Sequence, residues 1–184
     1  IGLGSGALML WLKDQGVNVV GIELQPELIM AARENGFKVY QSLSEIPENS
    51  FQLVIAMDVF EHIVRASIDD YLVRIEGVLV DKGFLVARFP NCQSPSGVFT
   101  QYGDYTHVSY SSVPIFTHHA TGAGLVLVNS FEGIAVESYS EGLLRKILKN
   151  ALRTISRQIV RAALGSGTIP LWGDVVVVFK RARQ

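Results

Sequence analysis

The first half of the chain alternates between short apolar runs and segments whose apolar residues recur at helical spacing. The apolar runs predict strands at 17–23, 37–40, 51–57 and 84–89. Helices are predicted between them at 7–15, 26–35 and 66–79. Such alternation indicates a parallel sheet with helices on both faces, in which ligands bind at the carboxyl ends of the strands. We therefore expect functional residues just after residues 1, 23, 40, 57 and 89.

The second half begins with a polar, aromatic and turn-rich connection at residues 91–112. A connection of this length inside a compact domain is usually functional, so we predict a substrate or active-site loop. Helices follow at 113–122 and 141–164, and strands at 125–130 and 174–180. The helix at 141–164 is basic and amphipathic, and we predict that it is an insertion.

Composition narrows the class of protein. The chain has 184 residues, of which 48% are hydrophobic, and a net charge of −1. These values predict one folded domain over residues 1–184 and give no overall signal for binding polyanions such as nucleic acid. Cys92 is the single cysteine, so no disulfide can form within the chain, and a reducing, cytoplasmic setting is expected. No apolar run reaches the length of a bilayer span.

A glycine-rich turn opens the chain. Gly2, Gly4 and Gly6 lie between a strand end and a helix, where glycine permits positive φ and close approach of a ligand. Glu23 ends the next strand, at the spacing of a carboxylate that binds a ribose diol. This pattern fits either SAM (S-adenosylmethionine) or a dinucleotide, and a turn without a ligand is the third possibility. A phosphate-binding P-loop is excluded because the turn lacks Lys-Ser or Lys-Thr.

Three segments resemble the class I SAM-dependent methyltransferases at their family spacing. They are GLGSG at the start, GIELQPELIMAAREN at 21–35 and FQLVIAMDVFEHI at 51–63. The resemblance implies a Rossmann-like, mostly parallel sheet of seven strands, with the first strand truncated in this chain. RFPN at 88–91 and YGDYTH at 102–107 are similar to methyltransferases of bacterial polysaccharide and glycan biosynthesis. That similarity implies O-methylation of a sugar or glycan precursor, or of another small molecule.

The resemblance also implies a cofactor pocket for SAM and its product S-adenosylhomocysteine. Gly2, Gly4 and Gly6 would line the methionine end of SAM, and Glu23 would bind the ribose with Leu24 on the adenine. The adenine would also be approached by Ser42 and Leu43, and the methionine side by Asp58 and Val59. An acid is common after the third strand, but this sequence has Gln41 and Ser42 there.

Candidate chemistry lies in the loop at 91–112. His107 with Asp104 beside it is a suitable general base near neutral pH, and Tyr102 is close in sequence. The structural alternative is a loop that Asp104 and aromatic packing hold in place. Some methyltransferases hold Mg²⁺ with a similar Glu-x-x-Glu-His segment and a distant His. A metal site here would use Asp58, Glu61, His62 and His107, but Mg²⁺ prefers oxygen ligands, so the general base is favoured.

The role of the basic helix at 141–164 has several possible interpretations, and so does the function of the chain. The cations of the helix are Arg145, Lys146, Lys149, Arg153, Arg157 and Arg161. The helix could pack on its own domain, contact an anionic membrane, or bind a lipid-linked diphosphate acceptor; nucleic acid is a weaker candidate because no nucleic-acid module is present. An NAD-type oxidoreductase and a non-catalytic SAM-binding module are the alternative functions. The first would lack a second catalytic domain, and the second would not need Asp104 and His107.

Overall fold

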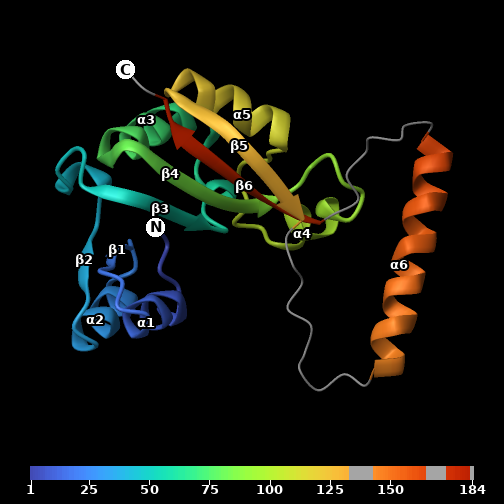
Figure 1. Ribbon diagram of the computed structural model, residues 1–184, viewed down its shortest axis with the longest axis horizontal. Coiled ribbons are helices and arrows are strands. Elements are labelled where there is room, and N and C mark those ends of the chain that lie inside the picture. The colour runs from blue at the N-terminus through green and yellow to red at the C-terminus, as the bar shows by residue number, and fades with distance from the viewer. Residues whose placement is uncertain (133–142, 165–172, 183–184) are drawn as a thin grey trace.

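The computed structural model describes residues 1–132, 143–164 and 173–182 (Figure 1). The amino-terminal half contains α1 (Ala7–Asp14), β1 (Val20–Ile22), α2 (Pro26–Glu34), β2 (Lys38–Tyr40), η1 (Leu43–Glu45), β3 (Phe51–Met57), η2 (Phe60–His62), η3 (Arg65–Ser67), α3 (Ile68–Val78) and β4 (Leu79–Pro90). The carboxyl-terminal half contains α4 (Gly97–Gly103), α5 (Val113–Gly122), β5 (Leu125–Glu132), α6 (Leu143–Leu164) and β6 (Asp174–Arg181).

The described strands form two sheets instead of one. β1 and β2 pair in parallel, and a mixed sheet of four strands has the order β3-β4-β6-β5. β3 and β4 are parallel, whereas β6 runs antiparallel to both β4 and β5. The prediction of a mostly parallel seven-stranded sheet is therefore wrong in detail, while the alternating α/β architecture is observed. The pairing direction of β6 could not be read from DVVVVFK because a continuously apolar strand suits either direction.

Residues 1 and 2 connect the two sheets. The Ile1 nitrogen donates a hydrogen bond of 2.7 Å to the carbonyl of Ile55 in β3. The Gly2 N–H donates one of 2.9 Å to the carbonyl of Ile22 in β1. The start of the chain thus lies between β1 and β3, and the glycine turn follows directly from this position.

Two apolar cores correspond to the two sheets. In the larger core, α3 and α5 cover one face of the four-stranded sheet, where Leu85, Phe116 and Phe179 are fully buried. On the other face Phe84, Val126 and Val128 are 38%, 54% and 55% exposed. The sequence predicts helices on both faces of the sheet, but the described helices cover only one face of these four strands. The smaller core joins α1, α2 and β2 through Met9, Ile29 and Val39, among others. These cores fix the strand ends that carry the site.

Two local predictions need correction. The predicted loop at 91–112 contains the short helix α4, which has only 7 residues and is too short to show a repeated helical pattern in the sequence. The sequence Asp81-Lys82-Gly83 also predicts a turn between the helix at 66–79 and the strand at 84–89, but these residues lie within β4, where Lys82 has φ of 62°. No helix among the described residues is both long and apolar enough to cross a bilayer.

Candidate functional site

The glycine turn has the backbone conformation that glycine permits. Gly2, Gly4 and Gly6 all have positive φ, at 67°, 51° and 76°. A Cβ atom at Gly2 would lie 2.7 Å from Cγ2 of Val59, whereas a Cβ at Gly4 or Gly6 would meet no atom within 4 Å. The turn is therefore pressed against the segment after β3 on one side and open on the other, as a ligand-binding turn requires.

Glu23 directly follows β1 beside this turn and is 9% exposed. Its Oε1 accepts hydrogen bonds from the N–H groups of Leu24 at 2.7 Å and Gln25 at 3.1 Å. Among the described residues, none donates a hydrogen bond to Oε2. One oxygen thus fixes the loop and the other stays available to a ligand such as a ribose diol. The Leu24 side chain is 76% exposed next to it.

Ser42 and Leu43 follow β2 and have local structural roles. Ser42 and Glu45 form a capping box around η1, in which the Ser42 hydroxyl accepts a hydrogen bond from the Ser44 N–H. The Leu43 side chain is 4% exposed and lies in the larger core. A ligand here would meet half-buried Ser42 and backbone groups, while the Leu43 side chain faces the core.

Asp58 and Val59 follow β3 directly. Asp58 has φ of 55°, a left-handed conformation that Asp and Asn adopt more readily than other residues except glycine. The guanidinium of Arg88 in β4 donates a two-point hydrogen bond to the Asp58 carboxylate, at 2.8 Å from Nε to Oδ1 and also from Nη2 to Oδ2. These hydrogen bonds raise the pKa of Arg88. Arg88 was missed from the sequence because a polar residue in a strand is usually read as solvent-facing.

Glu61 is a buried carboxyl group in η2, only 3% exposed. Its Oε2 atom is buried and has no hydrogen-bond partner in the part of the chain that the structure describes. Burial raises the pKa of Glu61 to about 7, and the nearby Asp58 and Asp174 carboxylates add to this rise. Burial likewise raises the pKa of Asp174 at the start of β6. Glu61 also lines a small pocket whose polar members include Arg65, Gln101, Ser109, Tyr110 and His119.

The loop after β4 brings His107 to Glu61 and His62. The N–H groups of Val108 and Ser109 both donate to the Glu61 carbonyl, at 2.8 and 3.0 Å. The rings of His62 and His107 meet edge to face with centroids 4.9 Å apart. Glu61, His62 and His107 each offer one ligand atom within 4.8 Å of the others. The structure therefore brings together three of the four residues named for a metal site, while Asp58 pairs with Arg88.

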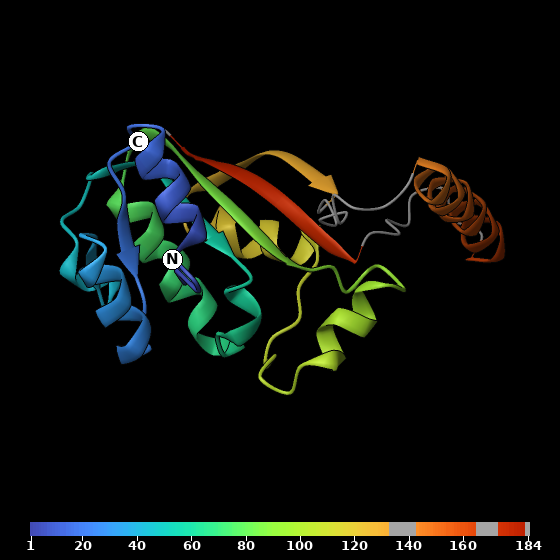
Figure 2. The same ribbon diagram turned by 90° about the horizontal axis from the view of Figure 1, so that it is seen from below.

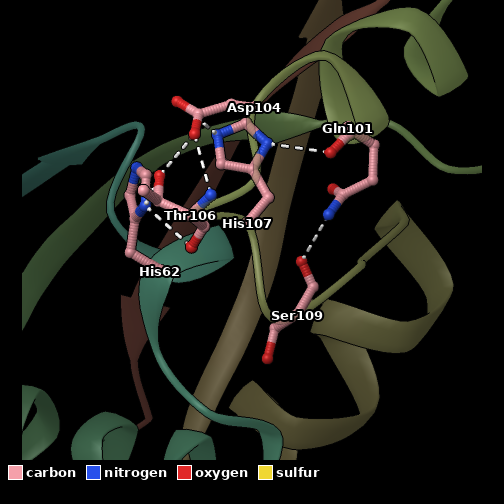
Figure 3. A network of polar contacts seen from close by, with 6 residues as sticks. All are labelled: His62, Gln101, Asp104, Thr106, His107 and Ser109. Carbon is pink, nitrogen blue, oxygen red and sulfur yellow. Dashed lines mark hydrogen bonds and ion pairs between the residues drawn. The ribbon is translucent and has the colours of Figure 1, made fainter.

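Figure 3 shows what orients His107. Its Nδ1 lies 3.2 Å from the Gln101 carbonyl, and its Nε2 lies 3.9 Å from Oδ2 of Asp104, beyond hydrogen-bonding distance. Oδ1 of Asp104 instead accepts hydrogen bonds from the Thr106 hydroxyl at 2.6 Å and the Thr106 N–H at 2.8 Å, which lower the pKa of Asp104. In this structure the backbone carbonyl of Gln101 orients the His107 ring, a role that the sequence predicts for Asp104.

Thr106 and Gln101 complete this network, and Tyr102 does not take part in it. Thr106 contacts Nδ1 of His62 through its hydroxyl at 3.1 Å. The Gln101 side chain is 4% exposed and donates to the Ser109 carbonyl at 3.0 Å, which holds α4 against the loop. Tyr102, by contrast, is 78% exposed on α4. No sequence signal pointed to Gln101 or Thr106, because neither residue type implies chemistry by itself.

The donor set fits Mg²⁺ poorly. Two imidazoles and one carboxylate favour zinc or another transition metal, whereas Mg²⁺ takes oxygen ligands in octahedral geometry. The Thr106 hydroxyl and the Gln101 carbonyl already contact Nδ1 of His62 and His107.

Comparisons with known proteins bear on the family and the fold. Residues 1–87 match the sequence model of a family described as "Methyltransferase domain". A Schizosaccharomyces pombe protein described as an uncharacterized methyltransferase is 35% identical over 97 residues, which make up 48% of this chain and 37% of the relative. The chain therefore matches well under half the length of that curated relative.

Solved methyltransferase structures share the fold. A SAM-dependent methyltransferase from Archaeoglobus fulgidus superposes with a TM-score of 0.70 at 18% identity, covering 98% of this chain and 83% of the other. The 1,6-didemethyltoxoflavin-N1-methyltransferase of Burkholderia thailandensis, which has its substrate and S-adenosylhomocysteine bound, gives a TM-score of 0.62 at 15% identity, covering 99% and 69%. The chain therefore has the fold of SAM-dependent methyltransferases.

Proposed function

We propose that this chain transfers the methyl group of SAM to a hydroxyl oxygen of a sugar, a glycan precursor or another small molecule. The observation that carries the proposal is the convergence of the three motifs at one edge: the glycine turn contacts Val59, and Glu23 keeps one carboxylate oxygen free beside it. A dinucleotide would use the same turn, but it gives no role to the Glu61, His62 and His107 cluster that follows β3.

The residues present suit SAM. The open side of Gly4 and Gly6 and the free Oε2 of Glu23 would hold its methionine and ribose parts, with Leu24 and Ser42 at the adenine and Asp58 and Val59 at the methionine side. When bound, SAM supplies an electrophilic methyl group on a sulfonium centre. The protein must then place the acceptor oxygen in line with that group and take up its proton.

His107 is the base that we propose for that proton. If Nδ1–H donates to the Gln101 carbonyl, the Nε2 lone pair remains free to accept a proton. As the oxygen–carbon bond forms and the sulfur–carbon bond breaks, the hydroxyl proton would pass to Nε2. Arg65 and Tyr110 line a small, mostly apolar pocket beside Glu61 and would offer hydrogen-bonding groups to part of a hydroxylated acceptor. A non-catalytic SAM-binding module would not require this arrangement.

The test is methyl transfer by the full-length protein from isotopically labelled SAM to a panel of nucleotide sugars and lipid-linked sugars. We expect label in one acceptor class, and NMR of the product should show a new O-methyl signal. Label on nitrogen or carbon would refute the hydroxyl acceptor. Binding of SAM without transfer to any acceptor in a panel that also contains phenols and carboxylic acids would favour the binding module.

A further inference from the structure

Helix α6 carries an apolar face that nothing in the described structure covers. Ile147, Leu148, Leu152, Ile155 and Ile159 are between 55% and 62% exposed. Figures 1 and 2 show the helix standing apart from the sheet and from the helices that cover it. Burying one such side chain contributes about 1.5–3 kcal/mol, so a continuous face of five marks an interaction surface.

The charge of α6 indicates what that surface binds. Residues 143–164 contain six Lys or Arg residues and no Asp or Glu. Because the whole chain has a net charge of −1, the rest of the chain carries −7. Net positive charge is thus concentrated on α6, whose apolar face no described residue covers, and the rest of the chain would be repelled by an anionic surface.

The two properties occupy different sides of the helix. At about 100° per residue, the five apolar positions span an arc of roughly 140°, and the six cations follow on the remaining circumference. This is the pattern of a helix that lies in the plane of a lipid interface, with its apolar side among the acyl chains and its cations at the phosphates.

A second copy of α6 fits this surface less well. A coiled-coil seam is narrower, with two apolar positions in each heptad. Two copies of a helix with six cations and no acids would also place like charges opposite each other along the seam. A membrane-spanning role is excluded by the same charges, in agreement with the absence of a spanning helix among the described residues.

We propose that α6 binds the surface of an anionic lipid bilayer, with the face of Ile147, Leu148, Leu152, Ile155 and Ile159 inserted between the headgroups. The inference does not depend on methyl transfer, because the surface is separate from the pocket beside Glu61. It would bring the domain to the place where a lipid-linked acceptor is found.

The test is co-sedimentation of the full-length protein with vesicles, without SAM or acceptor. Vesicles of phosphatidylcholine alone are compared with vesicles that also contain phosphatidylglycerol, at low and high salt. We expect binding only to the anionic vesicles and weaker binding at high salt. Absence of binding, or equal binding to both kinds of vesicle, would overturn the proposal.

Matched variants locate the binding. Leu152→Asp/Ile155→Asp removes apolar groups, and Arg153→Glu/Arg157→Glu reverses charges; each should weaken binding at least about tenfold. Arg74→Glu/Lys82→Glu makes the same charge change at exposed positions of α3 and β4 and should bind as the wild type does. Equal losses in this control would overturn the assignment to α6. A dimer in sedimentation velocity that Leu152→Asp/Ile155→Asp dissociates would show a self-association surface instead.

Discussion

Gly2 and Val59 touch across the candidate site, and there is no room for a side chain between them. A Cβ atom at residue 2 would lie 2.7 Å from Val59 Cγ2, closer than real Cβ contacts. This contact joins the glycine turn to the segment after β3, so the two halves of the predicted cofactor pocket are held together by packing.

The contact predicts the effect of Gly2→Ala. Gly16 offers a matched control, because its φ of 75° is equally positive but a Cβ there would meet no atom within 4 Å. Both alanines bear the cost of a left-handed residue, about 1–2 kcal/mol, and only Gly2→Ala adds overpacking of about 1–3 kcal/mol. Urea unfolding should therefore show a lower midpoint for Gly2→Ala than for Gly16→Ala. Equal midpoints would mean that Val59 moves aside at no cost in stability, which would contradict the predicted overpacking.

Two substitutions of Glu23 separate its predicted contact with the ribose from its role in holding the loop. Glu23→Gln keeps an oxygen that can accept from Leu24 and Gln25 but replaces the free Oε2 by a donor. Glu23→Ala removes both. We expect SAM affinity to fall by about 1–3 kcal/mol in either variant, with loop destabilisation only in Glu23→Ala. Unchanged affinity in both, measured calorimetrically, would contradict the pocket.

His107 tests the proposed base. His107→Ala should lower turnover by about 10²–10⁴-fold while SAM affinity stays within about twofold. Asp104→Asn should lower turnover less, because its hydrogen bonds serve Thr106 and only the more distant Oδ2 faces His107. Wild-type turnover in both variants would refute the assignment. If EDTA abolishes turnover and Mg²⁺ restores it, the site would be a metal site and not a general base.

Glu61 predicts a pH dependence of stability. Its pKa in the folded protein is about 7, above the ordinary value of 4.5, so the folded state holds its proton more tightly than the unfolded chain. Its contribution is present below pH 4.5 and is lost as pH rises through 7, by about 3 kcal/mol. The free energy of unfolding in EDTA should fall between pH 5 and pH 8 in the wild type more than in Glu61→Gln. Parallel curves would contradict this.

The alternation of strands and helices could be predicted because each element carries its own periodicity, from Ala7 to Phe89. For the same reason, the sequence could predict that Glu23 and Asp58 follow the ends of strands β1 and β3. The direction of β6, the helix α4 and the pairing of Asp58 with Arg88 could not, because they depend on contacts between distant segments. His107 and Asp104 show the same limit: proximity in sequence suggested a pair, but the loop directs Asp104 to Thr106.

The most direct test of the central claim is calorimetric titration of the full-length protein with S-adenosylhomocysteine and, separately, with NAD. The account predicts saturable binding of S-adenosylhomocysteine at one site, weakened in Glu23→Gln, and no heat from NAD. Binding of NAD with no binding of S-adenosylhomocysteine would contradict it and would make the glycine turn a dinucleotide site.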